Sequence, residues 1–134
     1  MSAVTLDHLI LPVNDREASL AFYTQTLGFA HAGERPPFAV VRVNEATTLQ
    51  LAPWGTEGNQ HLAFAMPRAE FEAIFARVRA AGTAYGDSFH TVGNGQGPGD
   101  EDGARGPGKA LYLLDPSRHL IEIRYYEQVY RKPH

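Results

Sequence analysis

The sequence predicts an α+β fold in which a β-α-β-β-β pattern occurs twice along the chain. The main observation is an internal near-repeat: Asp7 to Pro12 reads DHLILP, and Gln60 to Pro67 reads QHLAFAMP. Each segment is a strand-like run with a His-Leu pair that leads into a helix-like pattern. Short strand-like runs follow each helix, which favours antiparallel or mixed pairing over a regular alternation of strands and helices.

Two helices are expected, one in each half. The first spans residues 15–27, with Asp15 placed as its N-cap and Gly28 placed to end it. The second has Gly82 at its end and four apolar residues at the i, i+3, i+4, i+7 spacing of a buried helix face. These four residues are Phe71, Ile74, Phe75 and Val78.

The remaining strands are predicted from short runs of β-branched, aromatic and aliphatic residues between turn signals. They are residues 29–31, 39–43 and 48–52 in the first half, and 84–86, 109–114 and 119–126 in the second, with a further candidate at 90–92. Glycine and proline dominate residues 93–108, GNGQGPGDEDGARGPG, so no regular element is expected there. Both a surface connection and a lid over a site stay open for this segment.

Composition excludes several classes of protein. The chain has 134 residues, a length that suits one compact domain or two small modules with a shared core. It has no cysteine, which excludes disulfides and thiol nucleophiles. Its 12 basic and 15 acidic residues form no basic stripe, which disfavours a nucleic-acid partner. No membrane-length apolar run and no basic leader are present, so a cytoplasmic protein is expected.

Three polar residues stand on otherwise apolar strand faces. His8 and His61 occupy equivalent positions on the first strand of each half. Glu122 lies between two isoleucines on the last strand, and Gln50 is its counterpart in the first half. An imidazole or carboxylate in such a place costs free energy unless it is hydrogen-bonded or ligated. Two imidazoles and one carboxylate hold a divalent ion and leave coordination positions open.

A second interpretation needs no metal. A single histidine on an apolar strand is more often a hydrogen-bonded core residue than a ligand, and Glu122 could form an ion pair with Arg124 or Arg42. The repeat-equivalent placement of the two histidines favours the metal site.

The sequence resembles the vicinal oxygen chelate superfamily, which includes glyoxalase I, extradiol dioxygenases, fosfomycin-resistance thiol transferases and bleomycin-binding proteins. The resemblance covers residues 4–126 and is carried by DHLILPVNDREASLAFYTQTLGF, QHLAFAM and ALYLLDPSRHLIEIRYY. The most specific part is the closing signature, aromatic-x-x-Asp-Pro-x-x-His-x-x-Glu. Its residues in this chain are Tyr112, Asp115, Pro116, His119 and Glu122.

The resemblance implies the glyoxalase/bleomycin resistance/dihydroxybiphenyl dioxygenase fold. Residues 1–134 would then form a single domain of two βαβββ modules, at about 4–53 and 60–126, whose mixed sheets form a cup around a metal ion. The family commonly builds such sites across a homodimer. The resemblance assigns His8, His61 and Glu122 as the metal ligands, a set similar to that of the dioxygenase and fosfomycin-resistance branches.

Two departures from the family pattern bear on function. Gln50 stands where glyoxalase I has a glutamate that serves as ligand and base. An amide cannot take a proton at neutral pH, which disfavours ordinary glyoxalase I chemistry and leaves Gln50 an orienting residue. The usual glycine of the closing turn is also replaced, by Ser117 and Arg118, which alters turn geometry more than chemistry.

The resulting expectation is a divalent-metal-dependent enzyme that uses Fe2+, Mn2+, Zn2+ or Ni2+ on a small oxygen-chelating substrate. The reaction would be dioxygenase-like, a lyase or isomerase step, or a resistance-type transfer. The alternative is a non-catalytic antibiotic-sequestering protein of the bleomycin-resistance type. The candidate residues for contact with a substrate or drug are Trp54, Tyr126 and Phe38. Three intact ligand positions favour the enzyme.

Overall fold

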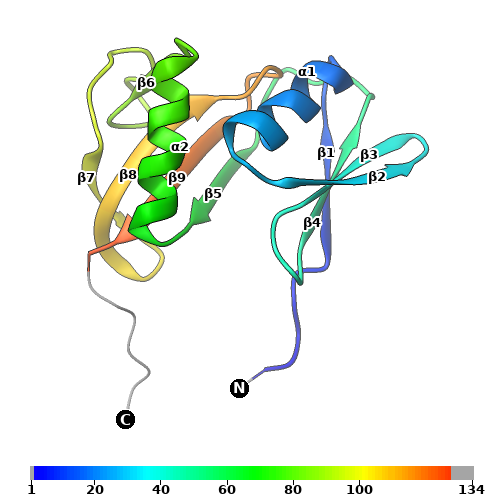
Figure 1. Cartoon of the computed structure of the whole chain (residues 1–134), viewed down its shortest axis with the longest axis horizontal. Helices are drawn as coiled ribbons and strands as arrows, with labels where there is room; N and C mark the ends of the chain where they lie inside the picture. The colour runs from blue at the N-terminus through cyan, green and yellow to red at the C-terminus, as the bar shows by residue number, and fades with distance from the viewer. Residues whose placement is uncertain (1, 128–134) are drawn as a thin grey trace. The chain divides into compact units, whose positions relative to one another are not determined.

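The structure, a computed structural model, describes residues 2–127. It divides into two compact units, each built on its own sheet. The first unit comprises Met1–Gly58 with Asp115–Arg118, and the second comprises Asn59–Leu114 with His119–His134. In Figure 1 residues 2–58 run from blue to green-cyan, and the rest of the described chain runs from green to red, with the turn Asp115–Arg118 of the first unit in orange. Two mixed sheets with few helices confirm the predicted α+β class.

The first unit contains a four-stranded sheet in the order β1-β4-β3-β2. Its strands are β1 (His8–Pro12), β2 (Ala30–Arg35), β3 (Phe38–Arg42) and β4 (Thr48–Ala52). The pairing of β1 with β4 is parallel and the other two pairings are antiparallel. Alternate side chains of β1 and β4 are buried, among them Leu11, Leu49 and Leu51. His8 and Ile10 therefore lie on the opposite, open face of this sheet.

The first helix changes its winding halfway along. The Asp15 carboxylate accepts a hydrogen bond from the Ala18 amide at 3.0 Å, which confirms the predicted N-cap. The α-helix α1 (Arg16–Ala21) then widens into a π-helical turn, η1 (Phe22–Thr26). The Thr24 hydroxyl bonds to the Leu20 carbonyl at 2.7 Å, a side-chain bond that competes with the backbone ladder and favours such a distortion.

The closing turn between the last two strands, Asp115–Arg118, belongs to the first unit. The buried Tyr23 hydroxyl donates to Asp115 Oδ2 at 2.6 Å, and the Asn14 amide donates to Ser117 Oγ at 2.9 Å. Burial, and then the negative charge of Asp115, raise the pKa of Tyr23, so its phenol keeps the proton that this bond uses. Asp115 of the closing signature therefore holds the closing turn in place through its hydrogen bond with Tyr23. Arg118 occupies the left-handed region at φ 69°, a backbone conformation that favours glycine.

The second unit contains a five-stranded sheet in the order β5-β9-β8-β6, with β7 also paired to β8. Its strands are β5 (His61–Ala65), β6 (Tyr85–Gly86), β7 (Gly99–Gly103), β8 (Gly106–Leu114) and β9 (Leu120–Tyr126). The pairing of β5 with β9 is parallel and the others are antiparallel. This unit therefore also has the mixed pairing that the sequence predicts.

The helix of the second unit, α2 (Arg68–Ala80), covers one face of this sheet (Figure 1). Its buried residues are the four that the sequence pattern predicts: Phe71, Ile74, Phe75 and Val78. The ring of Phe71 packs edge-on against Tyr125 of β9, with centroids 5.0 Å apart. Gly82 lies just past the end of the helix at φ 68°, as expected for the residue that stops it.

Two sequence predictions in this unit are wrong. Residues 90–92 form no strand, because the Thr91 amide donates to the Ser88 carbonyl at 3.1 Å and closes a turn. The glycine-rich residues 93–108 are not without structure, because β7 and the start of β8 form a hairpin there. At Gly103 a Cβ would overlap the guanidinium of Arg124. Its lack of a side chain therefore permits a close approach within a sheet, and does not mark a flexible connection.

Candidate metal centre

The face of the second sheet opposite α2 carries the polar residues of the candidate site. In register, Ala63 of β5 lies beside Glu122 of β9, which lies beside Tyr112 of β8. Side chains alternate along a strand, so His61, Glu122 and Arg124 share this face while the isoleucines of β9 face the helix. Three neighbouring strands thus bring together residues that are up to 63 positions apart in the sequence.

The two oxygens of Glu122 have different partners. Oε1 lies 3.0 Å from Nε2 of His61, and Oε2 accepts a hydrogen bond from Nη1 of Arg124 at 2.8 Å. The Glu122 side chain is buried, whereas the His61 side chain is 50% exposed. An ion could therefore reach the pair from the histidine side. The structure brings together two of the three predicted ligands.

Tyr112 completes the surroundings of the carboxylate. Its ring centroid lies 6.2 Å from that of His61, and its hydroxyl is hydrogen-bonded to Glu122. Burial raises the pKa of Tyr112, and the charge of Glu122 raises it further. The phenol therefore stays protonated at neutral pH and donates a hydrogen bond to the carboxylate.

The spacing of this pair is that of a hydrogen bond, and it is also compatible with two neighbouring ligands of one ion. When a nitrogen and an oxygen each lie about 2.1 Å from an ion and subtend a right angle, they are about 3.0 Å apart. Nε2 of His61 and Oε1 of Glu122 are 3.0 Å apart. Imidazole and carboxylate are also the donors that Fe2+, Mn2+ and Zn2+ accept. Within residues 2–127, no group of three His, Asp or Glu side chains is arranged to hold a metal.

The third predicted ligand, His8, belongs to the first unit, at the start of β1. Its Nδ1 lies 2.8 Å from Oδ2 of Asp7, and its side chain is 47% exposed. A carboxylate on one ring nitrogen is the usual support for a histidine that ligates metal through the other. Gln50 lies on the neighbouring strand β4, in register with Ile10, and therefore on the same open face as His8.

The three residues predicted to contact a substrate lie in both units. Phe38 and Trp54 pack edge to face in the first unit, with ring centroids 5.7 Å apart, and Trp54 is 60% exposed. Tyr126 lies at the end of β9 in the second unit. Its ring lies beneath the Arg124 guanidinium at 4.5 Å, and its hydroxyl accepts from the Arg105 amide at 3.2 Å. Tyr126 therefore joins β9 to the β7–β8 hairpin.

Arg124 is the residue of this site that sequence reasoning undervalued. The sequence indicates Arg124 only as an alternative ion-pair partner for Glu122, and the structure shows that this ion pair forms. Arg124 is almost fully buried, and its Nη2 donates to the Glu101 carbonyl of β7 at 3.0 Å. The signal in the sequence is an arginine two positions after a glutamate on a strand, since residues i and i+2 share a face.

This chain belongs to the Glyoxalase/Bleomycin resistance protein/Dioxygenase superfamily, whose sequence model matches residues 5–123. The predicted family and fold are thereby confirmed. Among solved structures, the chain is similar to Oxidase ChaP-H1, with 30% identity and a TM-score of 0.76 over 92% of this chain and 96% of that one.

Two further relatives come from named bacteria. The chain is 25% identical to the Salmonella typhimurium virulence protein STM3117, over 90% of this chain and 83% of that protein. TnmS3, an antibiotic binding protein from Streptomyces sp. CB03234, shares the fold at 21% identity and a TM-score of 0.70, over 95% of this chain and 99% of that one. Among residues 2–127, no helix is both long enough and apolar enough to span a membrane.

Proposed function

We propose that this chain is a divalent-metal-dependent enzyme acting on a small substrate that offers two adjacent oxygens. The observation that carries the proposal is the His61–Glu122 pair, whose nitrogen and oxygen are spaced like neighbouring ligands on an open sheet face. Membership of the superfamily and similarity to a protein named an oxidase support the proposal.

In this proposal His8, His61 and Glu122 hold the ion. Two neutral imidazoles and one carboxylate leave a divalent ion with net positive charge and open positions, which suits a chelating substrate. When bound, the ion acts as a Lewis acid on the substrate oxygens. Fe2+ is the natural ion for this ligand set and favours a dioxygenase-like reaction. Mn2+, Zn2+ or Ni2+ would favour a lyase, isomerase or transferase reaction.

The chain's other residues would then orient the substrate. Gln50 can donate or accept a hydrogen bond but cannot take up a proton, so it positions a substrate or a water and does not act as the base of glyoxalase I. The Tyr112 hydroxyl donates a hydrogen bond to the Glu122 carboxylate and so helps to hold it. We further propose a single-domain cytoplasmic protein that completes its site as a homodimer, as is common in this family.

A second function is favoured by one observation in the first unit. Trp54 and Phe38 form an aromatic pair, and the tryptophan is largely exposed. Such a pair suits stacking on a planar drug. The second candidate is therefore an antibiotic-sequestering protein that binds without catalysis.

The metal content of the purified chain distinguishes the two functions. Chain prepared without chelators is expected to carry about one divalent ion, measured by plasma mass spectrometry. His61→Ala and His8→Ala should each lose it, because two remaining ligands bind an ion weakly. His90→Ala, at an exposed histidine stacked on Phe89, is the matched control and should keep the ion.

The opposite result would favour sequestration. A chain that takes up no ion from any of the four metals, and whose Trp54 fluorescence is quenched by a planar aromatic drug, would overturn the enzyme proposal.

A further inference from the structure

We propose that Arg124 is a positioning residue for Glu122, and that the β7–β8 hairpin holds Arg124 in place. The hairpin is thereby part of the site, although none of its side chains is a proposed ligand. In its consequence for metal affinity this inference rests on the proposed function. The positioning of Glu122 by the hairpin through Arg124 does not depend on a metal and can be tested on the metal-free chain.

Arg124 is held so that one nitrogen remains for Glu122. Its Nη1 donates to Oε2 of Glu122, its Nη2 donates to the Glu101 carbonyl, and its guanidinium lies over the Tyr126 ring. Its buried Nε has no acceptor within the described part of the chain. The direction of the guanidinium thus depends on two hydrogen bonds and one ring, and one of those bonds comes from the hairpin.

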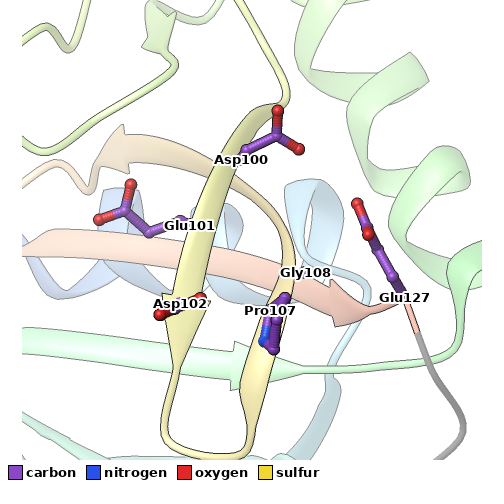
Figure 2. Close-up of a pocket in the computed structure, with 6 residues that line it drawn as sticks. All are labelled: Asp100, Glu101, Asp102, Pro107, Gly108 and Glu127. Carbon is purple, nitrogen blue, oxygen red and sulfur yellow. The ribbon is translucent and has the colours of Figure 1, made fainter.

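Two glycines of the hairpin make room for this side chain. At Gly103 a Cβ would overlap the Cζ of Arg124, and at Gly108 a Cβ would lie 2.9 Å from its Nη2. Figure 2 shows Glu101 on the first strand of the hairpin and Gly108 on its second strand, β8, which pairs with β9. Any side chain at residue 103 would therefore force the guanidinium to move.

The consequence concerns the orientation of the carboxylate. Because Arg124 occupies Oε2, Glu122 directs Oε1 alone toward His61. Without the Arg124 hydrogen bond the carboxylate keeps only its contacts with Tyr112 and His61, and it is freer to turn about its terminal torsion, which is broad and roughly two-fold. A ligand that must be ordered on binding loses affinity, and residues that support a metal ligand typically contribute about 10–100-fold.

Two substitutions that keep a positive charge at residue 124 test this inference. Arg124→Lys retains the charge but loses the planar fork, and Gly103→Ala retains Arg124 but displaces it. Each is expected to weaken Zn2+ binding by about 10–100-fold, measured by competition with a chelating dye. In the metal-free chain, each should also shift the His61 imidazole ¹⁵N resonances at fixed pH. The double variant should be little worse than either single variant, because both act on the same contact.

Gly106→Ala is the matched control. Gly106 lies in the same hairpin at φ 111°, and a Cβ there would meet no atom within 4 Å. This variant strains the hairpin without touching Arg124, so it should leave the His61 resonances and the Zn2+ affinity unchanged. Effects in Gly106→Ala equal to those in Gly103→Ala, or fully additive effects in the double variant, would overturn the inference. Unchanged His61 resonances in Gly103→Ala would also overturn it, whether or not the wild-type chain binds zinc.

Discussion

Replacement of Glu122 by glutamine is expected to lower the free energy of unfolding of the metal-free chain by about 3 kcal/mol. The reason is the partner that remains: Arg124 is 3% exposed, and the substitution leaves its charge buried without a counter-ion. Removing one member of a buried pair is far more damaging than removing both. Urea denaturation monitored by circular dichroism measures the change.

Two comparisons isolate the cause of this loss. Glu72→Gln breaks an exposed helical pair with Arg68 and is expected to change stability by less than about 0.5 kcal/mol. The double variant Glu122→Gln with Arg124→Met removes the stranded charge and should regain part of the stability. A Glu122→Gln chain as stable as the wild type would contradict the buried ion pair.

Replacement of Gly58 by alanine is expected to destabilise the chain by about 3 kcal/mol or more. Gly58 has φ 81°, a left-handed conformation that costs a non-glycine residue about 1–2 kcal/mol. In addition, its Cβ would lie 2.5 Å from the carbonyl oxygens of both Ser117 and Arg118. These are backbone atoms of the closing turn, so the clash cannot be relieved by a side-chain rotation. The melting temperature measures the effect.

Gly82→Ala separates the two contributions. Gly82 has φ 68°, and a Cβ there would meet no atom within 4 Å, so it carries the backbone strain without the clash. Its expected cost is about 1 kcal/mol. Equal losses at the two glycines would show that the closing turn does not approach Gly58 as closely as described.

The elements of the fold were largely predictable because their signals are local. The N-cap at Asp15 and the apolar spacing of the second helix depend on neighbours within one or two turns. The internal repeat placed His61 on a first strand, and the family signature placed Glu122 on the last. Pairing these two strands in parallel then brings both residues to one face.

The features that escaped prediction depend on contacts between distant residues. Gly103 lies in a glycine-rich segment for which the sequence predicts no regular element. Its role is to leave room for the Arg124 guanidinium, a contact that only the folded structure shows. Asp115 belongs to the closing signature, and it accepts a hydrogen bond from the buried hydroxyl of Tyr23, 92 positions away. No periodicity or spacing within the sequence encodes such a partner.

The ion pair of Glu122 with Arg124 and the proposed metal site are compatible. The two interpretations were alternatives at the level of sequence, because a single carboxylate seemed to need one partner. In the structure the two carboxylate oxygens have different partners: Oε2 accepts a hydrogen bond from Arg124, and Oε1 lies next to His61. A glutamate can therefore be held by an arginine and still present one oxygen to an ion.

Anomalous scattering from crystals grown with Zn2+ tests whether His61 and Glu122 bind one ion together. We expect a zinc peak about 2.1 Å from both Nε2 of His61 and Oε1 of Glu122, with Arg124 still bonded to Oε2. Zinc bound elsewhere, or no zinc while these two atoms keep their 3.0 Å separation, would contradict it.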